Sequence, residues 1–398
     1  PVAQLLAREA DKKYATDKRP KSIIVLWLAG GPSQLETFDP HPGTNIAAGT
    51  KAIGTAATNV QLAADYPRLA EQMASIALVR SVTSKEGDHE RGTYTVKTGY
   101  RPAPGLVHPT IGAVCCHAME VAGAEIPRHV SILPGQWPAW GGFLGSHYDA
   151  FKIGDPARKV PDVASRADDA RTRARLADLD VVESEFARRR AGRADATLHR
   201  QRIDDARRMM TSEQLAAFDV MQEPSAVRAA YGDTPFGRGC LAARRLTEVG
   251  VRCVEVTLGG WDSHAKNHES HRELAATLDP AFAALIADLK QRGTLERTII
   301  LCGGEFGRTP RMNPLGGRDH WPHGFTIALA GGGLRGGVAI GETDPEGGRE
   351  VRTPQRIEDI HATILTALGL DIASENDTAA KRPIKLSEGT PIRALFDS

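Results

Sequence analysis

The sequence predicts an α/β protein with a mostly parallel central sheet, helices on both faces of that sheet, and a helical insertion. Three observations predict this class: short apolar runs that end in glycine, helical patterns between several of these runs, and one stretch rich in Arg, Asp, Glu and Ala. With 398 residues, the chain is long enough for one large domain. We expect a single domain over residues 1–398, with a charged helical insertion at 155–230.

The first strand is predicted within KSIIVLWLAGG (21–31), where an unbroken apolar run enters a loop at two glycines. Such a run is typical of a strand that is buried on both faces. Further runs of the same kind predict strands at 75–79, 130–133, 251–258, 298–302 and 325–330.

The clearest helix is predicted for 272–292, where apolar residues recur at three- and four-residue steps and Gly293 follows as a C-cap. Because this helix lies between two predicted strands, we expect those strands to be parallel. Another helix, closed by Gly369, is predicted near the end of the chain. Within the charged segment, the arginines at 188–190 are balanced by nearby acids, and an apolar stripe predicts a helix: Leu176, Leu179, Val182 and Phe186.

Composition excludes several classes of protein. Lys and Arg total 50 against 49 Asp and Glu, so the net charge of +1 predicts neither a nucleic-acid partner nor an anionic membrane surface. No apolar run approaches the length of a membrane span. The five cysteines show no C-x-x-C spacing, which argues against a disulfide framework and a thiolate zinc site. The first 20 residues lack the pattern of a signal peptide, so we expect one to be absent or already removed.

Five of the 13 histidines fall between His264 and His323. Asp262 and His264, in GGWDSHAKNHESH, come directly after a predicted strand, and ligands bind at the carboxyl edge of an open parallel sheet. A carboxylate beside an imidazole is a ligand set that zinc takes in catalytic sites. We favour metal binding over a capped, hydrogen-bonded loop. His268 and His271 are predicted to be surface residues of the following helix.

A second cluster, in GGEFGRTPRMN and GGRDHWPHGF, follows the next predicted strand. Glu305 should converge with Asp262 at one end of the sheet because each follows its own predicted strand at the same topological place. Arg308 has a guanidinium suited to a phosphate or sulfate group, although a structural ion pair with Glu305 is the alternative. Enough ligands are available for one metal site or two: Asp262, His264, Glu305, Asp319, His320 and His323.

Two further residues are weighed for chemistry. Ser33 follows the glycine turn in GGPSQLETFDP, which lacks the lysine of a P-loop and the pattern of a dinucleotide site. A turn or N-cap role is favoured for Ser33 over that of a nucleophile. In GDHERGTYTVKTGY, Asp88 is the expected N-cap of a helix and His89 is predicted to be a site histidine.

Four blocks of the chain carry a family resemblance: KSIIVLWLAGGPSQLETFDP, HERGTYTVKTGYRP, GVRCVEVTLGGWDSH and GGEFGRTPRMNPLGGRDHWP. In this order they resemble the uncharacterised secreted family called domain of unknown function 1501, which is grouped with the alkaline phosphatase and sulfatase superfamily. The resemblance implies an alkaline-phosphatase-like three-layer sandwich with a metal centre at the carboxyl edge of the sheet. It also implies export by a twin-arginine signal, and hence a periplasmic or secreted protein.

The superfamily's site is only partly matched. Its aspartate and histidine after a middle strand match Asp262 and His264, at closer spacing than usual. The next Asp-His pair falls on Glu305 and Phe306, so an imidazole is missing. His320 or His323 matches the final histidine.

Two more positions depart from the superfamily pattern. Glycines 30 and 31 replace a carboxylate at the end of the first strand, unless Asp39 reaches back. The sulfatase signature, aligned on Thr98 and Gly99, puts His89 where the nucleophilic cysteine belongs. Formylglycine chemistry is therefore not supported.

These observations lead us to expect a metal-dependent hydrolase of a phosphate or sulfate ester, or a related anionic ester, outside the cytoplasm. Zinc is the expected metal, with calcium or manganese as alternatives, held by Asp262, His264 and His320. Glu305, Asp319 and His323 would complete that site or form a second one.

Arg308 would stabilise the transition-state anion, and His89 would act as a general acid or base, or as an unusual nucleophile. The substrate would be a small or polymeric anionic ester. The competing hypotheses are a degenerate protein that binds an extracellular glycan or polymer, and a cytoplasmic mutase of the same superfamily. The oligomeric state stays open.

Overall fold

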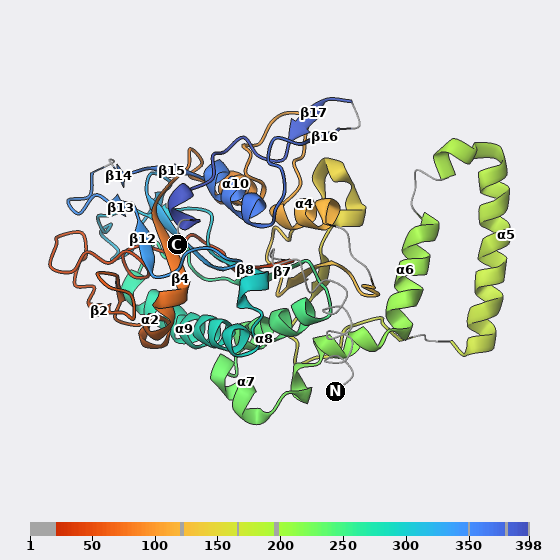
Figure 1. The fold of residues 1–398 in the computed structure, drawn as a ribbon, viewed down its shortest axis with the longest axis horizontal. Helices are drawn as coiled ribbons and strands as arrows, with labels where there is room; N and C mark the ends of the chain where they lie inside the picture. Colours follow the sequence, from red (N-terminus) through yellow and green to blue (C-terminus); the bar gives the residue numbers. More distant parts are fainter. Residues whose placement is uncertain are drawn as a thin grey trace.

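A computed structural model describes residues 21–119, 123–164, 167–194, 199–348, 351–378 and 381–396. Its centre is a sheet of nine strands in the order β12-β4-β11-β8-β1-β7-β5-β6, with β15 paired to β4 (Figure 1). The strands are β1 (Ser22–Leu28), β4 (Ile76–Thr83), β5 (His129–Ile132), β6 (Phe151–Ile153), β7 (Cys253–Leu258), β8 (Thr298–Gly303), β11 (Phe325–Gly331), β12 (Val338–Ile340) and β15 (Gln355–Arg356).

Strand direction brings several chain segments to one edge of this sheet. β1 lies between β7 and β8 and is parallel to both, with Leu28 opposite Leu258 and Trp27 opposite Gly303. β11 is antiparallel to both of its neighbours, β8 and β4. It therefore begins at the edge where β1, β4, β7 and β8 end. The predicted, mostly parallel sheet is confirmed, and β11 is the reversed strand.

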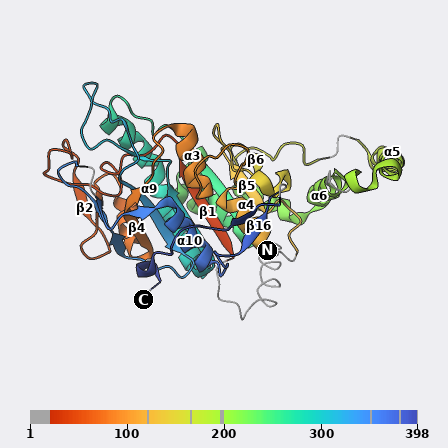
Figure 2. The same ribbon diagram turned by 90° about the horizontal axis from the view of Figure 1, so that it is seen from above.

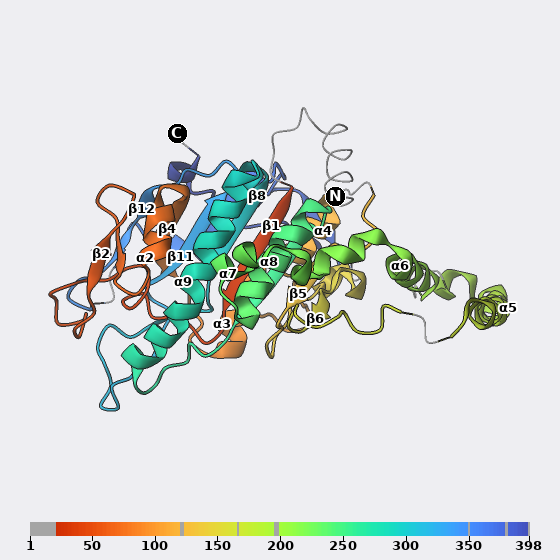
Figure 3. The same ribbon diagram turned by 90° about the horizontal axis from the view of Figure 1, so that it is seen from below.

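Both faces of the sheet are covered by helices (Figures 2 and 3). Along β1, side chains alternate between two hydrophobic clusters, as expected for a strand buried on both sides. One face is covered by α2 (Pro67–Gln72), α7 (Ser225–Tyr231), α8 (Pro235–Glu248) and α9 (Asn267–Gln291). The other is covered by α3 (His89–Thr98), α4 (Ile111–Ala118) and α10 (Ile357–Ala367). The predicted arrangement of helix, sheet and helix layers is confirmed.

Two helices project away from the sheet (Figures 1 and 3). They are α5 (Asp169–Ala194) and α6 (His199–Thr211), and both fall in the segment predicted to be helical. That this segment is an insertion into a single domain stays a prediction. The expectation about a signal peptide concerns the first 20 residues, which lie outside the described part. The side chains of residues 189 and 190 also lie outside it. Among the described residues, no helix combines the length and apolar character that crossing a bilayer requires.

Within the described part of the chain, four small two-stranded sheets lie outside the central sheet. They pair β2 (Ala52–Gly54) with β3 (Gln61–Ala63), β9 (Gly307–Arg308) with β10 (His320–Trp321), β13 (Glu342–Thr343) with β14 (Val351–Arg352), and β16 (Glu375–Asp377) with β17 (Pro383–Lys385). The β9–β10 pair matters most, because it sets Arg308 opposite His320 at the entrance to β11.

Buried histidines predict that the fold loses stability in acid. His361 on α10 is 3% exposed, and its Nε2 lies 2.8 Å from the Val96 carbonyl oxygen. Burial lowers the pKa of His361 to about 4. In the unfolded chain this group takes up a proton near pH 6.5, whereas the folded protein excludes it. Stability should therefore be complete above about pH 6.5 and fall by roughly 1.4 kcal/mol per pH unit for this residue down to about pH 4.

Denaturant unfolding at pH 7 and pH 5 tests this expectation. His361→Gln keeps a donor for the Val96 carbonyl but cannot titrate, so its loss of stability between the two pH values should be smaller than that of the wild type. An equal loss in both proteins would contradict the assignment.

Candidate metal centre

The glycine turn after β1 lets three loops meet. Gly30 has φ +117° and Gly31 has φ +77°, values that side-chain-bearing residues rarely adopt. A Cβ on Gly30 would lie 2.5 Å from the backbone nitrogen of Asp262, and one on Gly31 would lie 2.6 Å from the ring of Phe306. The loops that follow β7 and β8 can therefore approach the end of β1 only because these two residues are glycine.

Polar contacts tie the same turn to the loop after β8. The backbone N–H of Gly30 donates to both carboxylate oxygens of Glu305, at 2.9 and 3.2 Å. Arg308 donates from Nε to the Gly31 carbonyl at 2.8 Å and from Nη2 to the Gly30 carbonyl. Glu305 and Arg308 are thus fixed from the backbone of β1 rather than from their own loop alone.

Three imidazoles converge on the carboxylate of Asp262. The Nε2 atom of His89 lies 3.2 Å from Oδ2, and the Nε2 atoms of His264 and His320 lie 3.0 and 3.3 Å from Oδ1. His89 opens α3 after β4, Asp262 and His264 follow β7, and His320 lies in β10 just before β11. All of them stand at the sheet edge that strand direction defines, as the sequence predicted for Asp262, His264 and His320.

The other ring nitrogen of each histidine faces an acceptor. His89 Nδ1 lies 2.8 Å from Glu305 Oε1, and His264 Nδ1 lies 2.8 Å from Asp319 Oδ1. His320 Nδ1 lies 2.7 Å from the carbonyl oxygen of Gly87. Because ionised carboxylates and carbonyls only accept, each Nδ1 carries the hydrogen, and a neutral ring then has its lone pair on Nε2. This arrangement fixes ligating histidines in many metal sites.

The facing nitrogens of His264 and His320 lie only 3.1 Å apart. Two lone pairs at this distance repel each other unless one of the two nitrogens carries a proton or binds a cation. Zinc–nitrogen bonds of about 2.0–2.1 Å in a tetrahedron place ligand atoms about 3.3 Å apart, close to the separations around Asp262. Donor atoms of His89, Asp262 and His320 all lie within 4.8 Å of one another. The donor set and its spacing fit a divalent cation.

Electrostatics keeps this carboxylate ionised. Burial alone would raise the pKa of Asp262, but the hydrogen bond from Arg308 Nη2 at 2.6 Å and the nearby histidines lower that pKa to about 2. The hydrogen bond to Glu305 raises the pKa of His89, whereas burial lowers the pKa of His320. The hydrogen bond from His264 lowers the pKa of Asp319. Asp262 is therefore charged over the whole physiological pH range.

Arg308 corrects the sequence prediction. Its side chain is fully buried, and its donors are directed to the carbonyls of Gly30, Gly31 and Arg318 and to the carboxylate of Asp262. The sequence predicted that this guanidinium would contact a substrate anion, but its donors are directed to protein groups instead. The alternative was an ion pair with Glu305, but the ion pair that Arg308 makes is with Asp262.

Two candidate site residues, Ser33 and His323, are not brought to Asp262. Ser33 is fully buried, and its N–H donates to His271 Nε2 at 2.9 Å. His271, expected at the surface, is 2% exposed because it packs beneath the loop after β1, and burial lowers its pKa to about 4. His323 is exposed and its ring packs against Trp321. Among the described contacts, neither Ser33 nor His323 reaches the histidine cluster.

Asp39 does not replace the missing carboxylate at the end of β1. It accepts a hydrogen bond from the Thr343 hydroxyl at 2.7 Å and lies 3.3 Å from the Arg80 guanidinium. Glu305 and Asp319, predicted as metal ligands, instead hold the Nδ1 atoms of His89 and His264.

Phe306 and Asn313 complete the surroundings. The Phe306 ring centroid lies 4.4 Å from that of His320 and 5.2 Å from that of His89, so it supports both imidazoles. Asn313 Nδ2 donates to Asp319 Oδ1 at 3.1 Å and to the His264 carbonyl at 3.0 Å. The missing imidazole drew attention to Phe306, but no feature of the sequence singled out Asn313.

The sequence of the chain matches the profile of one protein family. The profile of the family described as "Protein of unknown function (DUF1501)" matches residues 20–396. The chain belongs to this family. A comparison with curated proteins found no relative.

Several solved structures resemble this chain in fold at low sequence identity. The PsFucS1 sulfatase from Pseudoalteromonas sp. is 13% identical, with a TM-score of 0.42 over 93% of this chain and 72% of that one. The alkaline phosphatase from the Antarctic bacterium TAB5 is 12% identical, with a TM-score of 0.42 over 89% of this chain and 99% of that one. The lipoteichoic acid synthase LtaP from Listeria monocytogenes is 10% identical, with a TM-score of 0.38 over 90% and 73%.

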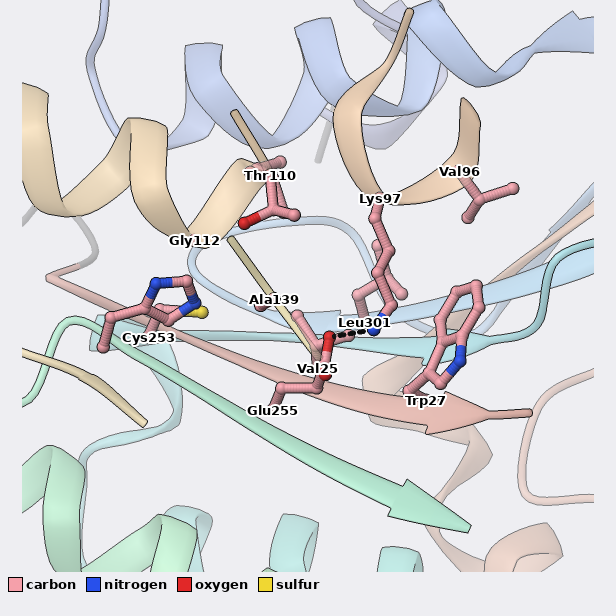
Figure 4. Close-up of a pocket in the computed structure, with 12 residues that line it drawn as sticks. Val25, Trp27, Val96, Lys97, Thr110, Gly112, Ala139, Cys253, Glu255 and Leu301 are labelled. Atoms are coloured by element: carbon pink, nitrogen blue, oxygen red, sulfur yellow. Dashed lines mark ion pairs between the residues drawn. The ribbon is translucent and has the colours of Figure 1, made fainter. Parts of the chain in front are cut away.

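In this DUF1501 protein, a buried ion pair fastens the helix that carries His89. Lys97, near the end of α3, reaches Glu255 on β7 at 2.8 Å, and both side chains are 4% exposed (Figure 4). Lys97 also donates to the Trp137 carbonyl at 2.8 Å and lies 4.8 Å from the ring centre of Trp27. The pair lines a small cavity between α3, α4 and the sheet. It joins the strand before Asp262 to the helix that begins at His89.

Breaking this pair should be costly because it leaves one charge buried without its partner. We expect Lys97→Met to lower the free energy of unfolding by about 3–5 kcal/mol. The double variant Lys97→Met with Glu255→Gln removes both charges and should recover most of that loss. Denaturant unfolding of the three proteins measures the effect. A double variant as unstable as Lys97→Met would show that the ion pair is not the cause.

Proposed function

We propose that this DUF1501 protein is a metal-dependent hydrolase of a phosphate or sulfate ester, or a related anionic ester, that acts outside the cytoplasm. One observation carries the metal assignment: donor atoms of His89, Asp262 and His320 lie within 4.8 Å of one another, and an acceptor holds the Nδ1 atom of each of the two histidines. The ester class and the location follow from the resemblance of the sequence to the alkaline phosphatase and sulfatase superfamily.

His89, Asp262 and His320 would hold the ion, with zinc as the metal that best suits two imidazoles and a carboxylate. His264 is more open, with 46% of its side chain exposed, and Asp319 lies behind it. It would therefore serve as the general acid or base. This proposal exchanges the roles that the sequence suggested for His89 and His264. A bound zinc ion would polarise the ester oxygen and lower the pKa of water.

The neighbouring charged residues orient the metal ligands and His264. Arg308 holds the carboxylate of Asp262 and keeps it charged. Glu305 fixes the ring of His89 so that Nε2 faces the centre. Asp319 orients His264 and would stabilise the imidazolium that forms when His264 takes up a proton. In this arrangement one ion is held per chain, because Glu305 and Asp319 are already engaged with histidines.

Metal analysis of protein purified without chelator tests the centre. We expect about one equivalent of zinc per chain after incubation and dialysis. Asp262→Ala and His320→Ala should weaken zinc binding by at least about 100-fold in a competition titration, because each removes a ligand. His323→Ala is the matched control and should bind like the wild type. Wild-type protein that retains less than about one-tenth of an equivalent of zinc, manganese or calcium would overturn the metal assignment.

A variant of His264 should distinguish metal binding from hydrolysis. We expect His264→Asn to keep bound metal but to lose about 100-fold or more of the hydrolysis rate, because a general acid or base contributes about this much. Asp319→Asn should lower the rate in the same direction. Rates would be measured with aryl phosphates, phosphodiesters and aryl sulfates. Unchanged activity in His264→Asn would remove that residue from the mechanism.

A binding protein with a degenerate site is the second hypothesis. Two observations favour it: Phe306 stands where the superfamily pattern has an imidazole, and Arg308 is too deeply buried to meet a substrate. Wild-type protein that binds metal, hydrolyses none of these esters and binds a sulfated or phosphorylated glycan would support this hypothesis over the enzyme.

A further inference from the structure

Helix α5 lies away from the central sheet in three views, with α6 between them (Figures 1, 2 and 3). Its 26 residues correspond to a length of about 39 Å. Val182 and Phe186 on this helix are open to solvent, at 65% and 43% exposed, and Leu176 and Leu179 are partly exposed. Helical stability in proteins comes mostly from packing of an apolar face, which α5 does not obtain from the central sheet.

Four of the five large apolar side chains of α5 form one stripe, and the fifth, Val181, lies on the opposite face. At 100° per residue, Leu176, Val182 and Phe186 all lie within about 60° of the line through Leu179. Arg175 and Glu183 fall within the same 60°, on opposite sides of that line. We call these six residues the α5 stripe: Arg175, Leu176, Leu179, Val182, Glu183 and Phe186.

The stripe has nearly the same pattern in both directions from Leu179. Leu176 and Val182 lie three residues before and after it, and Arg175 and Glu183 lie four residues before and after it. A two-fold axis at Leu179 would therefore set each Arg175 opposite Glu183 of an antiparallel second copy. Parallel pairing would instead set like charges against each other. The stripe is complementary to itself in the antiparallel direction.

We propose that α5 is a homodimer contact in which the α5 stripes of two copies of this chain pair antiparallel about Leu179. A surface that matches itself under a two-fold axis is what a closed dimer requires. One helix pair is small beside the roughly 1,600 Å² of a standard interface, so the dimer should be weak and depend on concentration. This inference does not depend on the proposed hydrolase activity.

Disulfide trapping tests the register. Leu179→Cys places a thiol at the proposed two-fold axis, and Ala177→Cys is a matched control on the exposed, opposite face of the same helix. The five native cysteines are buried and contribute little background. Under mild oxidation, we expect a covalent dimer from Leu179→Cys at least about tenfold faster than from Ala177→Cys. Equal rates, or no dimer from Leu179→Cys, would overturn the register.

Charge exchange tests the pairing in solution. Sedimentation of the wild-type chain should show reversible dimerisation, and Arg175→Glu or Glu183→Arg alone should weaken it by about fivefold or more. The double exchange restores opposite charges and should recover the dimer. Arg188→Glu, on the far face of α5, is the control and should dimerise like the wild type. Circular dichroism would confirm that α5 stays helical. A wild-type chain that stays monomeric at several hundred micromolar, or a double exchange that fails to recover the dimer, would overturn the proposal.

Discussion

The close approach of three loops at Gly30 and Gly31 is the constraint on which the rest of the centre depends. The backbone of this turn binds Glu305 and Arg308, and the missing side chains leave room for Asp262 and Phe306. Glu305 in turn orients His89, and Arg308 holds Asp262. A side chain at either glycine would therefore separate the carboxylate from its imidazoles without altering any of them directly.

Strand direction supplies the other half of the arrangement. Parallel strands β1, β7 and β8 end at one edge, so their loops carry the acidic residues and His264 to the same place. The reversed strand β11 begins at that edge, which lets His320 enter from the opposite chain direction. The buried pair of Lys97 and Glu255 then sets α3 across the sheet, with His89 at its first turn. Residues far apart in the sequence thus meet because of the strand directions in the sheet and one buried ion pair.

Much of this could be predicted from the sequence. Apolar runs, four of them leading into glycines, predicted the six longest strands, and the rule that ligands gather at carboxyl edges predicted that Asp262 and Glu305 would converge. The reversal of β11 left no trace in its apolar run, because periodicity carries no direction. The burial of His271 and Arg308 also escaped prediction. A polar residue is expected at the surface unless the segment that covers it is known. His271 in α9 and Arg308 in β9 both contact the loop after β1, which is distant from them in the sequence.

Anomalous diffraction from crystals grown with zinc tests the central claim most directly. The account predicts one peak per chain, about 2 Å from Nε2 of His89 and His320 and from a carboxylate oxygen of Asp262, with each Nδ1 still facing its acceptor. A fully occupied peak elsewhere, or a centre in which Asp262 is bound only by protonated imidazoles in the presence of excess zinc, would contradict it.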